Sequence, residues 1–269
     1  MFDSFDELRV ERICFQYDHK PTLQDVSITA RKGRITTVLG PNGAGKTTLF
    51  KIIDLLIRAS AGKILAGGKD VLSLNAAESR EWRQSIAFVL QEPYLFNMSI
   101  RENLAVPLRM RKVEKGRIEQ TLQDAIQKFN LGEIAGKKPF RLSSGERKRA
   151  GLVRALITEP ALLILDEPTA SIDPEASYII EQYLKDLRSD GRTIILMSTH
   201  DLFQARRLAD DAVLLYKGKM IEAAGKDCFF NSPCSDITRK FINGEILIDK
   251  DRPCCAEPGQ NLSPGTARS

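Results

Sequence analysis

The chain has 269 residues, of which 42% are hydrophobic, and it carries a formal net charge of +5. This composition can bury a substantial core, but no apolar run approaches the roughly 18 residues of a membrane-spanning helix, and the first four residues begin no export signal. Five cysteines without C-x-x-C spacing argue against a zinc site or disulfide framework, and the basic clusters are too short to favour nucleic-acid binding. We therefore expect a cytosolic protein with reduced thiols that neither spans nor crosses a membrane.

The most specific motif follows an N-terminal β-rich stretch that extends to about residue 30. Ile35, Val38 and Leu39 predict a short buried strand, and the chain then fits the phosphate-binding pattern G-x-x-x-x-G-K-S/T without a mismatch. The residues of this loop are Gly40, Pro41, Asn42, Gly43, Ala44, Gly45, Lys46, Thr47 and Thr48. The pattern predicts that the protein holds a nucleoside triphosphate.

Each residue type in this loop has a role in holding phosphate. The glycines let backbone N–H groups turn inward, Lys46 brings a positive charge to the β and γ phosphates, and the Thr47 hydroxyl can coordinate Mg²⁺. A helix is predicted to begin at the loop and to direct its positive dipole end at the phosphates. Its apolar positions recur at helical spacing and are Leu49, Ile52, Ile53 and Leu56.

The next segment, residues 63–86, is predicted to hold polar turns and a helix over Ala76–Arg83. A strand over Ile86–Leu90 follows and ends just before Gln91. The pattern is helical from there to about residue 149, with a capping box over Ser99–Glu102 and a second helix over Glu114–Phe129.

A second helix start lies at Leu142–Glu146, and this helix is predicted to run to Thr158, where Glu159 and Pro160 stop it. Its free N–H groups offer a second anion site, although an ordinary helix cap has the same composition. Both interpretations stay open at this point.

Two adjacent carboxylates follow an uninterrupted apolar run. Ala161–Leu165 predicts a central parallel strand that ends in Asp166 and Glu167. Ligands bind at the carboxyl end of such strands, so Asp166 can hold the Mg²⁺ shell while Glu167 orients or deprotonates the attacking water. The alternative is that the pair merely opens a loop before Pro168.

The order of these motifs resembles that of the ATP-binding cassette (ABC) ATPases over about residues 7–225. The resemblance implies that Gln91 touches Mg²⁺ and the water, and that His200 contacts the γ-phosphate as the switch histidine. It also implies that Ala170–Asp173 is the D-loop, with Asp173 near the nucleotide. Tyr17 matches the aromatic ring that stacks on adenine, although its strand parity with Ile13 also allows a place in the core.

The family resemblance implies the architecture. We expect an α/β P-loop NTPase cassette with a mixed central sheet, an N-terminal antiparallel β subdomain and an inserted α-helical subdomain at about residues 92–150. The ATPase domain is expected to span residues 1–248, and the polar tail over residues 249–269 is expected to be disordered.

In this family two copies meet head to tail, so a homodimer around two Mg-ATP is implied. Ser143, Ser144 and Gly145 would then face the ATP of the partner copy. The segment departs from the common form Leu-Ser-Gly-Gly-Gln, because Ser144 replaces the first glycine and Glu146 replaces the glutamine. These changes leave open how tightly ATP closes the site.

The resemblance further implies integral membrane permease subunits as partners, a substrate-binding protein in an importer, and peripheral attachment at the cytoplasmic face of the membrane. Glu92–Leu104, with apolar Tyr94, Leu95 and Phe96, is the expected permease contact, or else an ordinary helix entry. Three segments, Asp201–Asp210, Phe229–Phe230 and Phe241–Glu245, resemble ATPase subunits of importers for tungstate and related oxyanions or amino acids. The alternative function is a soluble ABC ATPase such as an iron–sulfur assembly factor.

Overall fold

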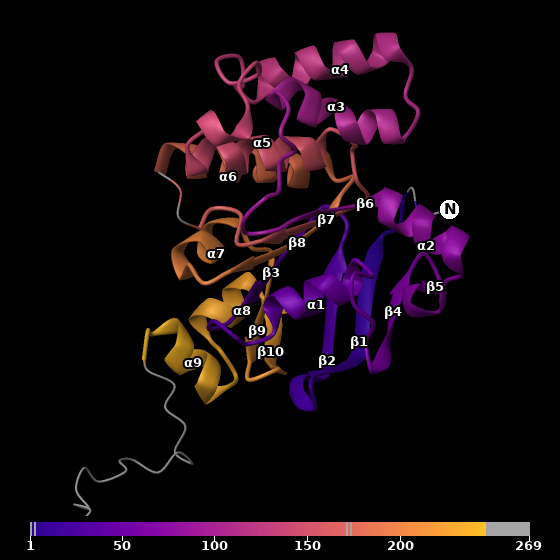
Figure 1. Ribbon diagram of the computed structural model, residues 1–269. Helices are drawn as coiled ribbons and strands as arrows, with labels where there is room; N and C mark the ends of the chain where they lie inside the picture. The colour runs from indigo at the N-terminus through magenta and orange to yellow at the C-terminus, as the bar shows by residue number, and fades with distance from the viewer. Residues whose placement is uncertain (1, 3, 171, 173, 246–269) are drawn as a thin grey trace, which may run out of the picture.

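The computed structural model describes residues 2, 4–170, 172 and 174–245, which form an α/β fold with two sheets (Figure 1). The predicted α/β cassette fold with an antiparallel sheet and a mixed sheet is confirmed. The strands are β1 (Glu7–Tyr17), β2 (Lys20–Arg31), β3 (Ile35–Leu39), β4 (Ala61–Ala66), β5 (Lys69–Asp70), β6 (Ile86–Val89), β7 (Leu162–Asp166), β8 (Ile194–Thr199), β9 (Asp211–Tyr216) and β10 (Lys219–Gly225). The helices are α1 (Lys46–Ile53), α2 (Ala76–Ser85), α3 (Ile100–Met110), α4 (Lys115–Lys128), α5 (Ser144–Leu156), α6 (Pro174–Asp190), α7 (Leu202–Leu208), α8 (Lys226–Asn231) and α9 (Asp236–Ile242), with 3₁₀ turns η1 (Val71–Ser73) and η2 (Pro139–Arg141).

The two sheets differ in their pairing. The smaller sheet is antiparallel with the order β2-β1-β4-β5, and the larger has the order β10-β9-β3-β8-β7-β6. Neighbours in the larger sheet run parallel from β9 to β6, and only the edge strand β10 is antiparallel to β9. Parallel strands share one carboxyl edge, so the loops after β3, β7 and β8 lie side by side.

The central strands are buried on both faces, and successive side chains along each strand pack alternately into two separate cores. Leu162 and Ile164 of β7 pack in the core that contains α1, whereas Leu163 and Leu165 pack in the core that contains α3 and α5. Helices α1 and α5 therefore cover opposite faces of the larger sheet, and α1 lies between the two sheets (Figure 1).

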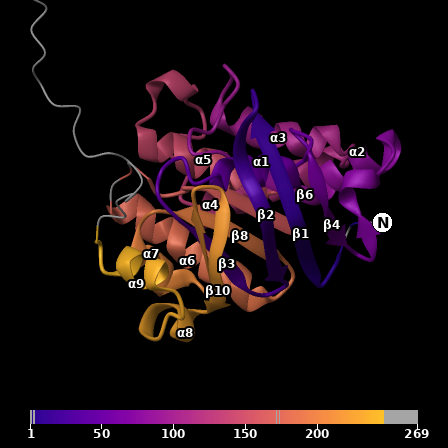
Figure 2. The same ribbon diagram turned by 90° about the horizontal axis from the view of Figure 1, so that it is seen from below.

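The helices between β6 and β7 form where the sequence predicts them. Ser99 and Glu102 make the predicted capping box of α3, and α4 spans Lys115–Lys128 within the predicted range. At the other end of the chain, α8 and α9 lie beside the edge strand β10 (Figure 2).

Two predictions about local structure are wrong. The helix after the phosphate loop ends at Ile53, because Leu55 takes a left-handed φ of 57°, and Leu56 is 56% exposed rather than part of the apolar face. The segment predicted as polar turns contains β4 and β5, and β4 pairs with β1. Within β4 only the side chains of Ile64 and Ala66 are buried, and two positions are too few to reveal the alternating pattern of a strand.

Some predictions fall on residues that the structure does not describe. The predicted polar tail over residues 249–269 and the D-loop residue Asp173 lie outside the described residues. Among the helices of the described ranges, none is long and apolar enough to cross a membrane.

Candidate nucleotide-binding site

The loop between β3 and α1 depends on glycine at two positions. Gly40 has a φ of 150°, and a Cβ there would lie 2.1 Å from the carbonyl oxygen of Leu215. Gly45 has a φ of 106°, and a Cβ there would lie 2.6 Å from Leu23 Cδ2. Both the backbone conformation and the available space therefore require glycine, and the loop can wrap closely around a ligand.

Lys46 lies at the first position of α1 with its ammonium inside the loop. The side chain is buried, and Nζ donates hydrogen bonds to the carbonyls of Gly40 (2.8 Å) and Pro41 (3.2 Å). Nζ also lies 3.7 Å from Glu167 Oε1. Burial lowers the pKa of Lys46, while the nearby carboxylates of Glu167 and Asp166 oppose that shift. The ammonium is thus at the helix start, where an anion would be stabilised.

Thr47 and Asp166 bring hard oxygen atoms together from α1 and β7. Thr47 Oγ1 donates to Asp166 Oδ2 at 2.6 Å, and Ser198 Oγ donates to Asp166 Oδ1 at 2.6 Å. Hydroxyl and carboxylate oxygens are the ligands that Mg²⁺ prefers. The donor set of this chain therefore fits a magnesium ion beside the phosphate loop.

Glu167 is fixed in an unusual backbone conformation. Its φ is 50°, its N–H donates to both the carbonyl oxygen and Oγ of Ser198, and its carboxylate is buried. Oε2 lies 3.1 Å from Nδ1 of His200, which follows the neighbouring strand β8. The sheet thus brings together two predicted catalytic residues that are 33 positions apart.

The two other predicted site residues, Gln91 and Tyr17, are both exposed. Gln91 is exposed in the loop after β6. Tyr17 ends β1, is 45% exposed and packs edge-on against Phe15 with ring centroids 4.6 Å apart. This exposure argues against the alternative in which Tyr17 belongs to the core.

The start of α5 has the geometry of a complete helix cap. Ser143 is the N-cap residue, its Oγ accepts from the N–H of Glu146, and Glu146 Oε2 accepts from the N–H of Ser143 at 2.7 Å. The hydrogen bond from the Ser143 N–H lowers the pKa of Glu146, so this carboxylate stays ionised. Ser144 and Gly145 form the first turn. This end of α5 belongs to the helix that covers the sheet face opposite α1.

Three residues that no motif of the sequence marks as part of the site lie beside it in the structure. They are Ser198, which bonds Asp166 and Glu167, and Lys148 and Gln204, which contact the turn after Glu167. Ser198 could have been found, since it precedes His200 on a strand parallel to that of Asp166. Lys148 and Gln204 carry no local signal, because polar residues are ordinary on helices.

Comparison with known proteins agrees with this geometry. Residues 23–170 match the sequence model of the ABC transporter family. The chain is 33% identical over 238 residues to a probable anion import ATP-binding protein of Haloferax volcanii, covering 84% of this chain and 82% of that protein. It is 38% identical over 219 residues to the tungstate uptake system ATP-binding protein TupC of Peptoclostridium acidaminophilum, covering 81% and 99%.

A solved structure also resembles the whole cassette. CbiO1 of Clostridium perfringens, part of the ABC transporter complex CbiONQ, superposes with a TM-score of 0.77 at 27% identity and covers 85% of this chain and 92% of that one. The fold and site define a P-loop ATPase. The chain belongs to the ABC transporter family, as an ATPase that binds ATP.

Proposed function

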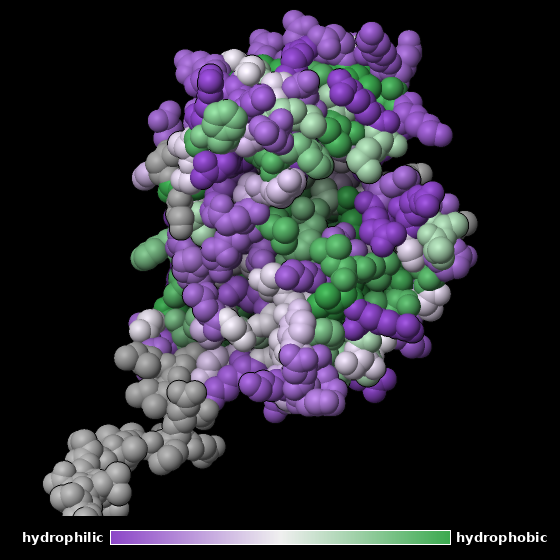
Figure 3. All heavy atoms as spheres, viewed as in Figure 1, coloured by the Kyte–Doolittle hydropathy of each residue, from purple (hydrophilic) through white to green (hydrophobic). Residues whose placement is uncertain are grey.

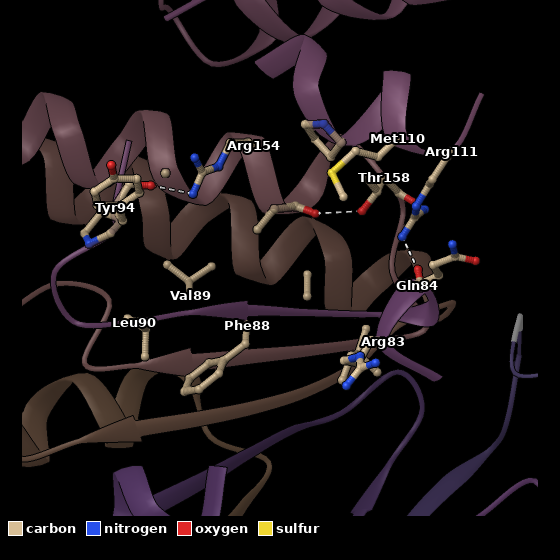
Figure 4. A pocket seen from close by; sticks show the side chains of 16 residues that line it. Arg83, Gln84, Phe88, Val89, Leu90, Tyr94, Met110, Arg111, Arg154 and Thr158 are labelled. Atoms are coloured by element: carbon tan, nitrogen blue, oxygen red, sulfur yellow. Dashed lines mark hydrogen bonds between the residues drawn. The ribbon is translucent and has the colours of Figure 1, made fainter. Parts of the chain in front are cut away.

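We propose that this chain is the ATP-hydrolysing motor of an importer whose membrane permease is a separate chain, to which it attaches at the cytoplasmic face. The proposal is supported by the import functions named for its relatives in Haloferax volcanii and Peptoclostridium acidaminophilum. The observation that carries it is an open groove of about 350 Å³ whose lining includes Leu90, the residue before Gln91 (Figure 4).

The groove lies between the edge strand β6 and the helices α3 and α5 (Figure 4). Its lining includes Leu90, Tyr94 and Met110, of which Tyr94 is 72% and Met110 is 75% exposed. Figure 3 shows apolar side chains gathered in a hollow on this face of the molecule. Exposed apolar surface next to a hollow is typical of a protein contact, and the groove has room for a short segment of a permease.

The groove is held in shape by contacts with α5. Arg154 Nη2 donates to the carbonyl oxygen of Tyr94 at 2.7 Å, and its guanidinium lies over the ring of Phe96 at 5.6 Å (Figure 4). The same loop begins at Gln91, so a partner in the groove would contact the segment that carries a predicted Mg²⁺ ligand.

In the proposed reaction Lys46 holds the phosphates. Thr47, Asp166 and Gln91 would hold Mg²⁺, which would neutralise phosphate charge and orient the attacking water. Glu167 accepts a proton from that water or orients it, and His200, 3.1 Å from Glu167, contacts the γ-phosphate. Tyr17 stacks on the adenine.

We infer that two copies meet head to tail, because the two helix starts belong to helices on opposite faces of one sheet. Ser143, Ser144 and Gly145 of one copy would face the phosphate loop of the other, with Asp173 nearby. Binding of ATP would close the pair, and hydrolysis would release it.

For the solute we favour an oxyanion such as tungstate or molybdate, because two relatives are named for anion and tungstate import. A substrate-binding protein would deliver it. Loss of the gene should reduce tungstate uptake by intact cells and leave methionine uptake unchanged. Reduced methionine uptake with normal tungstate uptake would overturn the choice of solute.

Isolation from native membranes tests the motor role. The wild-type chain should co-purify with a polytopic membrane protein, and Tyr94→Asp with Met110→Asp should lose that partner. Tyr178→Asp is a matched control, because Tyr178 is 62% exposed on α6, outside the groove. A soluble scaffold as the stable partner would instead favour the iron–sulfur assembly alternative.

A further inference from the structure

The turn after Glu167 determines where its carboxylate points. The N–H of Ala170 donates to the carbonyl oxygen of Glu167 at 3.2 Å and so closes the turn through residues 168–170. Glu167 itself has a left-handed φ of 50°, a conformation that persists only where surrounding contacts enforce it. The contacts on this turn therefore decide the position of the carboxylate.

Gln204 of α7 holds the turn from one side. Its side chain is only 1% exposed, and Nε2 donates to Thr169 Oγ1 at 2.5 Å and to Glu181 Oε1 at 3.3 Å. An amide nitrogen has two hydrogens, so both are used. The amide oxygen is buried and makes no hydrogen bond to any part of the chain that the structure describes, so the Nε2 contacts fix the amide.

The orientation of this amide is set by an ion pair whose carboxylate is buried. Glu181 is 5% exposed and accepts two hydrogen bonds from Arg207, at 2.9 Å from Nε and 2.6 Å from Nη2. A carboxylate can only accept, so an amide turned by 180° would place its oxygen against the Glu181 carboxylate and be repelled. Glu181 therefore keeps the NH₂ group of Gln204 directed at Thr169.

Lys148 of α5 holds the turn from the other side. Its side chain is 4% exposed, and Nζ donates to the carbonyl oxygen of Ala170. Nζ also lies 3.9 Å from Glu92 Oε1, in the residue next to Gln91. The helix that Ser143 caps is thus joined directly to the turn that follows Glu167.

We propose that Gln204 and Lys148 are positioning residues that clamp the turn 168–170 between α7 and α5 and so hold Glu167 against His200. Gln204 acts at the helix whose N-cap, Asp201, directly follows His200 and accepts from the N–H of Gln204. The inference deepens the proposed function and rests on the role proposed there for Glu167.

Removal of the hydroxyl that Gln204 contacts is the first test. In steady-state ATP hydrolysis by the full chain, Thr169→Val should lower kcat about 5- to 20-fold and change KM for ATP less than about twofold, because Thr169 acts through Glu167. Thr169→Ser keeps the hydroxyl and should restore kcat to within about twofold of wild type. Thr121→Val is the matched control, since the Thr121 hydroxyl donates to the carbonyl oxygen of Arg117 within helix α4.

A double-mutant cycle then assigns the effect to one bond. Gln204→Leu should lower kcat as Thr169→Val does, and the double variant should be no slower than the slower single variant. Lys148→Met keeps the aliphatic stem and should lower kcat severalfold with KM unchanged. Should Gln204→Leu fail to fold, the Thr169→Val and Thr169→Ser pair decides alone, since Thr169 is only half-buried.

Glu167→Gln separates this inference from the proposed function. If Glu167→Gln stops hydrolysis while Thr169→Val turns over like wild type, the clamp is wrong and the role of Glu167 stands. Multiplicative losses in the double variant, or equal losses in Thr169→Val and Thr169→Ser, would also overturn the clamp. Normal hydrolysis by Glu167→Gln would overturn both.

Discussion

The two candidate phosphate-contacting regions of this chain differ in how they use their polar groups. Around the phosphate loop, Lys46 pairs with Glu167 and Thr47 donates to Asp166, all within one subunit. At the start of α5, the Ser143 and Glu146 cap is satisfied within its own helix turn. The first region is held together by contacts between different elements of the fold, whereas the second offers the remaining donors of a helix start on the other side of the sheet.

The largest expected effect comes from the first region. Glu167→Gln should lower kcat for ATP by about 10²–10⁴-fold, because it removes the group that orients or deprotonates the water. ATP binding should persist, and light scattering should detect an ATP-bound dimer that accumulates. Normal ATP turnover by Glu167→Gln would show that Glu167 has no catalytic role and only opens the loop after β7.

Lys46→Ala tests the loop itself. The ammonium should donate at least two charge-assisted hydrogen bonds to phosphate, each worth about 1.5–3 kcal/mol, so affinity for Mg-ATP should fall at least about 100-fold. Isothermal calorimetry measures this affinity, and circular dichroism should show an unchanged fold. Equal affinity in variant and wild type would contradict the assignment.

Mixed dimers test whether the second region acts on a partner copy. In a head-to-tail pair, Lys46→Ala on one subunit and Gly145→Asp on the other damage the same composite site and leave the opposite site intact. An equal mixture should recover roughly a quarter of the wild-type closed sites, because half of randomly mixed dimers keep one site of two. Each parent alone should not close.

The control for this exchange is a mixture of wild-type subunits with a labelled wild-type copy under the same conditions. If those subunits exchange while the mixture of variants stays as inactive as its parents, the composite site loses its support. The start of α5 would then be an ordinary helix cap.

The smallest effect on hydrolysis is expected for Asp54→Asn, at the C-terminal end of α1. Burial raises the pKa of Asp54 to about 7, against the opposing charge of Arg83. Because the folded-state pKa lies above the unfolded value, wild-type stability should fall as pH rises from about 4 through about 7. Asp54→Asn should remove this loss and be more stable at pH 8 by about 2–4 kcal/mol, with no gain at pH 4.

Urea unfolding at both pH values measures this difference, and kcat should stay within about twofold of wild type. A stability gap that does not change with pH would contradict the raised pKa. A large loss of kcat would show that the two ends of α1 are not independent.

The parts of the site that sequence predicts are those with a local pattern. The phosphate loop has its glycines and Lys46 in one short stretch, and Asp166 and His200 each follow a buried apolar strand. Their meeting also follows from sequence, because parallel strands end at one edge. The exposed Leu56 was mispredicted because helical spacing does not reveal the left-handed turn at Leu55.

The parts that sequence misses depend on contacts between distant segments. Strand β4 forms through pairing with β1, and the edge strand β5 pairs with β4, and no local period encodes either pairing. Lys148 and Gln204 become significant only because α5 and α7 bring them to Ala170 and Thr169 from separate parts of the chain.

The contact between Gly151 and Pro93 has a consequence for how motion is transmitted. A Cβ at Gly151 would lie 2.5 Å from Pro93 Cβ, so only a hydrogen atom separates α5 from the loop that follows Gln91. A larger side chain at position 151 would force α5 and the loop apart, and a displacement of α5 toward the loop would press on Pro93. Gly151 therefore sets how closely α5 can couple to the loop that follows Gln91, although it brings no side chain to the groove that it lines.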